Sequence, residues 1–278
     1  MLTLLCTVRD CHAPLAIDGR RAVCERGHSF DFARSGYLNL LQPQDRRSRV
    51  PGDSADAVAA RRRFLDRGFA KPLLDAIVAF TQPADGPILD AGCGEGYHLG
   101  ALDAEERHGI DISVAAIDAA AKRYPSCHWI VANADRFLPY ADASFGIVAS
   151  ITARLNPAEF RRVLRDDGRL VIAIPGADDL VELRGMTRDR VERTVEMFAE
   201  HFTLERHEHV RHVAELDEEA VLDLLKTTYR RVKPRAGTVT MSRDLLRFVI
   251  PSVGEGPGRA AGTSSAPPPT QVPRLRSG

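Results

Sequence analysis

The sequence predicts an α/β fold in which helices cover both faces of a doubly wound, mostly parallel sheet, with a small cysteine-rich module before it. Two observations support this prediction. Short apolar segments of strand length alternate with helical patterns between residues 88 and 174, and three of the five cysteines fall within the first 24 residues. A chain of 278 residues with 44% hydrophobic content can bury a sizeable core as one main domain with an appendage.

The N-terminal module carries the residues of a zinc site. They are Cys6, Cys11, Cys24 and His28. A Cys-x4-Cys pair and a Cys-x3-His pair, twelve residues apart, can close a tetrahedron around zinc. His12 could compete with a cysteine for the fourth position. Because four protein ligands leave no open coordination position, we expect a structural zinc that stabilises a module too short to fold alone.

The remaining elements follow in a regular order. Expected helices span about residues 54–66, 71–80, 96–103, 113–123, 157–164, 189–201 and 217–226. Expected strands span about 88–91, 107–111, 127–131, 145–151, 169–174 and 202–210, with a last strand near the sheet edge. Ser54 or Asp53 would cap the first helix, Ser113 the fourth, and Asp166-Asp167-Gly168 would turn into the fifth strand.

Four segments are expected along the chain. They are a zinc-binding module (1–42), a linker with helices (43–85), a main α/β domain (86–250) and a disordered tail (251–278). The tail is rich in proline, glycine and serine, a composition that cannot bury a core.

The most informative motif follows the strand at residues 88–91. Asp90 is followed by glycines at alternate positions, Gly92, Gly94 and Gly96. Glycine lets the backbone turn sharply and lets a ligand approach where a Cβ would block it. The dinucleotide fingerprint G-x-G-x-x-G places its third glycine one residue later. The pattern D-x-G-x-G-x-G resembles instead motif I of the class I methyltransferases that use S-adenosylmethionine.

Two further acids lie after the next two strands. Asp111 follows Asp90 by 21 residues, where a doubly wound sheet binds ribose hydroxyls. Asp135 follows the third strand, where this superfamily usually contacts the adenine. The resemblance implies that the cofactor is contacted by Asp90, Asp111 and Asp135, by the three glycines, and by Glu95 and Tyr97.

Composition limits the remaining possibilities. The net charge is zero, which argues against a uniformly basic nucleic-acid binder, although arginines gather at Arg46, Arg47, Arg49, Arg61, Arg62 and Arg63. Met1–Leu5 is too short for a signal peptide, and no apolar run is long enough to span a membrane. Unevenly placed cysteines do not make a disulfide framework, so we expect a soluble, cytoplasmic protein.

The motifs together resemble one family. They are H-S-F-D-F-A-R-S-G-Y-L-N-L-L (28–41) after the Cys/His module, P-G-D-S-A (51–55), A-R-R-R-F-L-D-R-G (60–68) and L-D-A-G-C-G-E-G-Y (89–97). This combination is similar to the RlmA-type enzymes, which methylate N1 of a guanine in a hairpin loop of 23S ribosomal RNA. The resemblance covers residues 6 to 185 well. It implies a Rossmann-like methyltransferase domain, S-adenosylmethionine and structural zinc as cofactors, a 23S rRNA loop as partner, and the capacity to form a homodimer.

The resemblance leaves the catalytic residue open. N1 of guanine carries a proton, and candidates to receive it are Glu192, Asp178, Asp179 and His98. The arginines at 61–63 and the zinc module are expected to grip the RNA backbone. Four features depart from the family pattern and are expected near the pocket mouth: the longer Cys-x4-Cys knuckle, Ala70, Glu192 where the family has a histidine, and the segment 151–154. Methylation of a small molecule or a protein, or binding without catalysis, are the alternatives.

Overall fold

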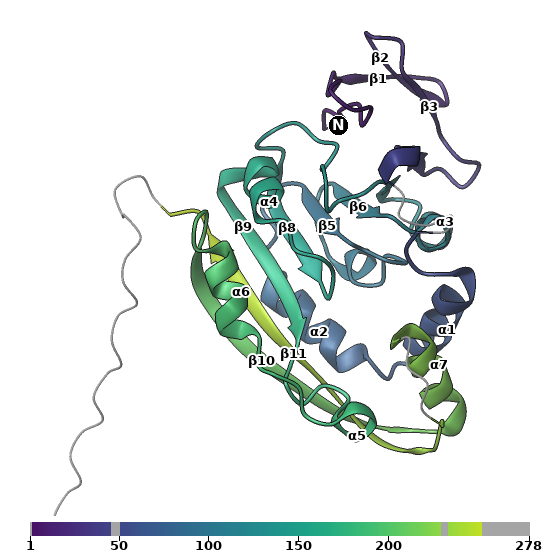
Figure 1. The fold of residues 1–278 in the computed structure, drawn as a ribbon, viewed down its shortest axis with the longest axis vertical. Helices are drawn as coiled ribbons and strands as arrows, with labels where there is room; N and C mark the ends of the chain where they lie inside the picture. The colour runs from purple at the N-terminus through teal and green to yellow at the C-terminus, as the bar shows by residue number, and fades with distance from the viewer. Residues whose placement is uncertain (1, 46–50, 229–232, 252–278) are drawn as a thin grey trace, which may run out of the picture.

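The computed structural model describes residues 2–45, 51–228 and 233–251, which form two sheets with surrounding helices (Figure 1). The expected tail, apart from its first residue, lies outside the described residues, as do Arg46, Arg47 and Arg49. Within the described ranges, no helix is long and apolar enough to cross a membrane.

The large sheet has eight strands among the described residues, in the order β10-β11-β9-β8-β5-β6-β7-β4. They are β4 (Leu38–Asn39), β5 (Ile88–Ala91), β6 (Arg107–Asp111), β7 (His128–Val131), β8 (Phe145–Ile151), β9 (Leu164–Pro175), β10 (Thr203–Leu216) and β11 (Gly237–Val249). β4 to β9 pair in parallel, and β11 is antiparallel to both of its neighbours. Because β5 has β6 on one side and β8 on the other, the winding reverses there, which creates a ligand crevice at the strands' carboxyl ends.

The N-terminal module contains a small antiparallel sheet. β1 (Leu15–Asp18) pairs with β2 (Arg21–Cys24), which pairs with β3 (Ser29–Asp31). Gly19, with a φ of 59°, makes the tight turn between β1 and β2. The chain then leaves the module and enters the large sheet as β4, parallel to β7. The module is therefore joined to the main domain through a shared sheet edge.

The helices connect and cover these strands (Figure 1). They are α1 (Ala55–Asp66), α2 (Lys71–Thr81), α3 (Val114–Arg123), α4 (Pro157–Val163), α5 (Val181–Arg184), α6 (Val191–Phe198) and α7 (Glu218–Thr228). The expected caps are confirmed, since Ser54 Oγ accepts from Ala57 N and Ser113 Oγ from Ala116 N, each at 3.2 Å.

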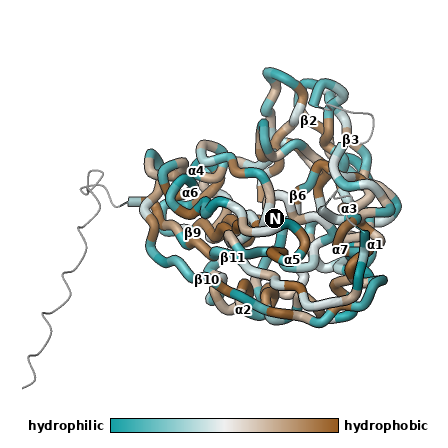
Figure 2. The backbone as a smooth tube through the Cα atoms, turned by 60° about the horizontal axis from the view of Figure 1, so that its bottom comes forward, coloured by the Kyte–Doolittle hydropathy of each residue, from teal (hydrophilic) through white to brown (hydrophobic). Residues whose placement is uncertain are grey.

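The apolar core forms one layer on each face of the large sheet. Successive strand residues point to opposite faces, so Ile88 packs with Ile117 on one side while Leu89 packs on the other. The layer that contains Leu89 continues into the zinc module through Leu15 and Phe30. Figure 2 shows hydrophilic residues along much of β10, which is the sheet edge opposite β4. The predicted doubly wound α/β fold is confirmed.

Two expected elements are different in the structure. The helix expected at 96–103 is only a 3-10 turn at Leu99–Ala101. Glycine disfavours helix, and at Gly100 an added Cβ would lie 2.4 Å from the Tyr124 ring, so the chain passes directly beneath that ring. The turn expected at Asp166–Gly168 is an irregularity inside β9, because pairing with β8 resumes only at Arg169.

Candidate functional site

Four side chains of the N-terminal module converge on one point. The ligand atoms of Cys6, Cys11, Cys24 and His28 all lie within 4.8 Å of one another. His28 Nδ1 is 3.4 Å from the sulfurs of Cys6 and Cys24, and the Cys11 and Cys24 sulfurs are 3.9 Å apart. Zinc–sulfur bonds of about 2.3 Å place two sulfurs of a tetrahedron roughly 3.8 Å apart. The cluster therefore fits a tetrahedral zinc ion with four protein ligands.

His12 does not take part in this cluster. Its ring stacks on Phe137 of the main domain, with centroids 4.2 Å apart and planes 12° from parallel. Its backbone φ is 50°, which turns the chain sharply directly after Cys11. The structure thus places Cys6 rather than His12 at the fourth position, and the His12 ring packs against the main domain instead.

The turn after β5 brings the glycines next to Asp111. Gly94 N donates to Asp111 Oδ2 at 2.9 Å, and Ser113 N donates to Asp111 Oδ1 at 2.8 Å. Gly92 and Gly96 have φ values of 86° and 78°. A Cβ on Gly92 would lie 2.3 Å from Ala153 Cβ, and one on Gly96 would lie 2.3 Å from Trp129. Glycine is therefore required at both positions.

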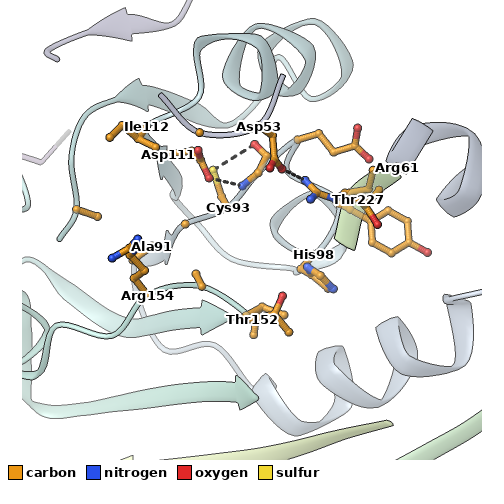
Figure 3. A pocket seen from close by; sticks show the side chains of 18 of the residues that line it. Asp53, Arg61, Ala91, Cys93, His98, Asp111, Ile112, Thr152, Arg154 and Thr227 are labelled. Carbon is orange, nitrogen blue, oxygen red and sulfur yellow. Dashed lines mark hydrogen bonds and ion pairs between the residues drawn. The ribbon is translucent and has the colours of Figure 1, made fainter. Parts of the chain in front are cut away.

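A cavity of about 1050 Å³ opens over this turn (Figure 3). Of the predicted cofactor residues, those that line it are Gly92, Gly94, Glu95, Tyr97, Asp111 and Asp135. Asp90 and Gly96 lie beneath the turn instead, since Asp90 is 1% exposed and Gly96 packs on Trp129. The volume is at the upper end of the range for small-molecule pockets, so the cavity can hold a nucleoside cofactor together with an acceptor.

The electrostatics of the cavity are set mainly by burial. Burial, reinforced by the charge of Asp111, raises the pKa of Asp90 to about 7. Neither carboxylate oxygen of Asp90 has a hydrogen-bond partner among the described residues. Burial also raises the pKa of Asp111. Burial, followed by the charges of Arg243 and Arg61, lowers the pKa of His98 to about 4, so this imidazole is neutral at pH 7.

The segment before α1 forms one wall of the cavity and was not predicted to do so. Arg61 Nη1 and Asp53 Oδ2 form an ion pair at 2.5 Å, and Ser113 Oγ donates to the Asp53 carbonyl at 2.7 Å. Gly52 lies so close to Ser113 that an added Cβ would be 2.7 Å from its Cβ. Figure 3 shows Asp53 and Arg61 next to Asp111. The P-G-D-S sequence could have indicated that this segment belongs to the site, but nothing in it predicted that Asp53 pairs with Arg61.

The arginines of α1 have intramolecular roles. Arg61 pairs with Asp53, and Arg63 makes a bidentate pair with Asp223 on α7, at 2.5 and 2.9 Å. Their guanidinium groups are therefore engaged within the protein. This arrangement does not favour the expectation that residues 61–63 grip RNA as a group.

The proton-acceptor candidates separate by position. His98 and Asp179 line the cavity, whereas Glu192 is exposed on α6 away from the lining. Asp178 accepts from Ser242 Oγ and Arg211, outside the lining. Asp179 is held by Arg184 at 3.1 Å and Arg243 at 2.6 Å. Two of the departures from the family pattern, Ala70 and residues 151–154, do line the cavity, as expected.

Comparison with known proteins gives matches over both parts of the chain. The model described as "RlmA, N-terminal" matches residues 5–49, and a methyltransferase domain matches residues 88–170. A Bacillus subtilis protein classed with the 23S rRNA (guanine-N1)-methyltransferases is 38% identical over 77% of this chain and 81% of its own length. The 23S rRNA (guanine(748)-N(1))-methyltransferase of Streptomyces fradiae is 35% identical over 76% of this chain and 80% of its own.

A solved structure agrees with these matches in fold. A chain from the Haloferax volcanii complex between the Trm112 methyltransferase activator and a methyltransferase superposes with a TM-score of 0.52. It is 18% identical, and the match covers 72% of this chain and 97% of that one. The α/β fold is thus that of S-adenosylmethionine-dependent methyltransferases, and with its zinc ribbon and its sequence relatives the chain belongs to the RlmA-type family of 23S rRNA (guanine-N1)-methyltransferases.

Proposed function

We propose that this protein transfers a methyl group to N1 of a guanine in a hairpin loop of 23S ribosomal RNA. The observation that carries the proposal is the extent of the sequence match. Two relatives named for this activity are 35–38% identical and match over 80% or more of their own length, and the chain carries both the zinc ribbon and the methyltransferase domain. A malonyl-[acyl-carrier protein] O-methyltransferase from Methylovorus matches only half of the chain.

The cavity fits S-adenosylmethionine by shape and by donor set. Gly92 and Gly94 leave a floor without side chains, on which the amino acid part of the cofactor can lie. The Asp111 carboxylate retains lone pairs beyond its two backbone donors and would accept from ribose hydroxyls. Asp135, exposed at the cavity rim, would face the adenine. When bound, the cofactor supplies an activated methyl group.

The chain's own groups would position the guanine and receive its proton. His98 faces into the cavity (Figure 3), and its neutral imidazole can accept a hydrogen bond from N1–H. Asp179 is a weaker candidate because two arginines already bind its carboxylate. Alignment of the acceptor nitrogen with the methyl group would supply most of the rate enhancement. We therefore assign His98 as the hydrogen-bond acceptor for N1–H; with a pKa of about 4 it would pass the proton on to solvent at pH 7.

The direct test is methylation of unmodified ribosomal RNA with radiolabelled S-adenosylmethionine, followed by digestion to nucleosides and mass analysis. We expect labelled 1-methylguanosine. A His98→Gln variant should bind the cofactor normally and transfer the methyl group more slowly. Cofactor binding without any label in RNA would refute the proposal and favour the small-molecule or protein substrate.

Two further expectations stay predictions. A homodimer is tested by sedimentation of the protein at assay concentration, with and without RNA. The cytoplasmic location follows from a ribosomal RNA substrate, and fractionation of cells that express the protein tests it.

A further inference from the structure

One residue of the zinc module, Arg9, reaches the lining of the cofactor cavity. It lies between Cys6 and Cys11, in the knuckle that is longer than the family's usual one. Its side chain is exposed. In the part of the chain that the structure describes, its guanidinium group has no hydrogen bond or ion pair, although arginines elsewhere on this surface are paired. Arg9 is thus a cation available to a ligand at the cavity.

The knuckle that carries Arg9 is fixed relative to the methyltransferase domain. On one side of it, Leu5 N donates to the Pro139 carbonyl at 3.0 Å. On the other side, His12 stacks on Phe137. Within the module, Arg26 donates to the Asp10 carbonyl at 2.9 Å. Because both ends of the knuckle are attached to the segment 137–139, the backbone that carries Arg9 is held beside the cavity.

Four arginines of the methyltransferase domain line the same cavity, and two of them, Arg184 and Arg243, bind Asp179. Arg136 pairs with Asp45, and Arg154 pairs with Asp135 at 3.3 Å. The Arg154 side chain is 76% exposed, so this pair is weak and can rearrange around a stronger anion. Figure 3 shows Arg154 and His98 on opposite sides of the cavity floor. Arg154 therefore lies away from the imidazole that we assign to N1–H.

We propose that Arg9, together with Arg154, binds the backbone phosphate next to the target guanine. This inference rests on the proposed function. A guanine that enters the cavity must leave its stack, which carries its flanking phosphates to the cavity mouth. A guanidinium group binds a phosphate through paired, charge-assisted hydrogen bonds. The zinc ion would then act in recognition indirectly, because it holds the knuckle that presents Arg9.

The test compares two arginines of the same module. Arg9→Gln removes the cation at the cavity, and Arg21→Gln removes an exposed cation on β2, away from the lining. For each variant we would measure RNA binding against salt concentration, the KM and kcat for methylation of a 23S rRNA fragment, cofactor affinity and zinc content. The last two measurements report whether the fold and both sites are intact.

We expect Arg9→Gln to raise the KM for RNA about tenfold and to reduce the slope of log K against log salt by about 1, as for one lost phosphate contact. Cofactor affinity and zinc content should be unchanged, and Arg21→Gln should match the wild type. Arg9→Lys should keep the salt slope but not the full affinity. If the wild type methylates RNA, but Arg9→Gln has the same KM and the same salt slope as Arg21→Gln, this inference is overturned and the proposed function stands. A wild type that leaves RNA unmethylated would overturn the proposed function and this inference with it.

Discussion

Two glycines of the turn after β5 should respond in opposite ways to the same added methyl group. At Gly96, φ is 78° and an added Cβ would lie 2.3 Å from Trp129. Carbon atoms normally approach to about 3.5 Å, so the indole or the turn must move by roughly 1 Å. At Gly94, φ is 55° and the nearest atom is Arg61 Nη1 at 3.5 Å, an ordinary contact.

The free-energy costs follow from this geometry. A left-handed backbone costs an alanine about 1–2 kcal/mol, and overpacking adds about 1–3 kcal/mol. Gly96→Ala should therefore destabilise the protein by about 2–5 kcal/mol. For a domain of this size that lowers Tm by roughly 4–20 °C. Gly94→Ala should cost only the backbone contribution of about 1–2 kcal/mol.

Cofactor binding should show the reverse order. Gly94 lines the cavity and Gly96 does not, so a methyl group at Gly94 takes space from the ligand. Calorimetric titration with S-adenosylmethionine, at a temperature where both variants are folded, measures this difference. We expect the larger loss of affinity for Gly94→Ala, and differential scanning fluorimetry should show the larger loss of Tm for Gly96→Ala.

A double mutant tests the cause. Replacing Trp129 with leucine makes room for the new methyl group, so Gly96→Ala should cost less in the Trp129→Leu background than in the wild type. If the two changes add, or if Gly96→Ala leaves Tm within 1 °C of the wild type, the steric argument is refuted.

Three other predictions concern the metal, the cofactor and pH. Cys24→Ser should lose the bound zinc measured by mass spectrometry, whereas Cys127→Ser, at a cysteine outside the cluster, should keep it; full zinc in Cys24→Ser would exclude the proposed ligand set. Asp111→Asn should raise the Kd for S-adenosylmethionine about 10- to 100-fold, because a hydrogen bond to a charged group contributes about 1.5–3 kcal/mol, and a change below threefold would remove Asp111 from the ribose. Folding raises the pKa of Asp90 to about 7, so the folded protein favours the protonated carboxyl. The stability that the protonated Asp90 contributes is fully present below the ordinary aspartate pKa of about 4, and it is lost as pH rises to about 7. The Asp90→Asn variant should not lose this stability between pH 5 and 7. If the wild-type Tm instead rises relative to that of the variant over this range, the raised pKa of Asp90 is contradicted.

Features that depend on neighbouring residues could be predicted from the sequence. Ser54 and Ser113 cap helices because a hydroxyl reaches an amide only a few residues further along the chain. β8 matches the predicted strand because its apolar run fits a strand buried on both faces. The zinc ligands were identified because cysteine and histidine at this spacing have few other uses.

The features that the sequence did not predict correctly depend on contacts between distant parts of the chain. The helix expected at 96–103 is only a 3-10 turn, and there Gly100 packs against Tyr124 from a different element. Arg63 was expected to contact RNA on charge alone, and the sequence did not predict its ion pair with Asp223, which lies 160 residues away. Neither interaction has a local signal.

The sequence by itself therefore predicted the α/β order, the candidate zinc ligands and the glycine turn, since each depends on residue types at short spacing. Only the tertiary structure decided that Asp53 and Arg61 close one wall of the cavity, and that His12 stacks on the main domain. It also decided that Arg9 of the zinc module reaches the cofactor cavity. Such contacts depend on how separate elements pack against one another, and packing is a property of the whole folded chain.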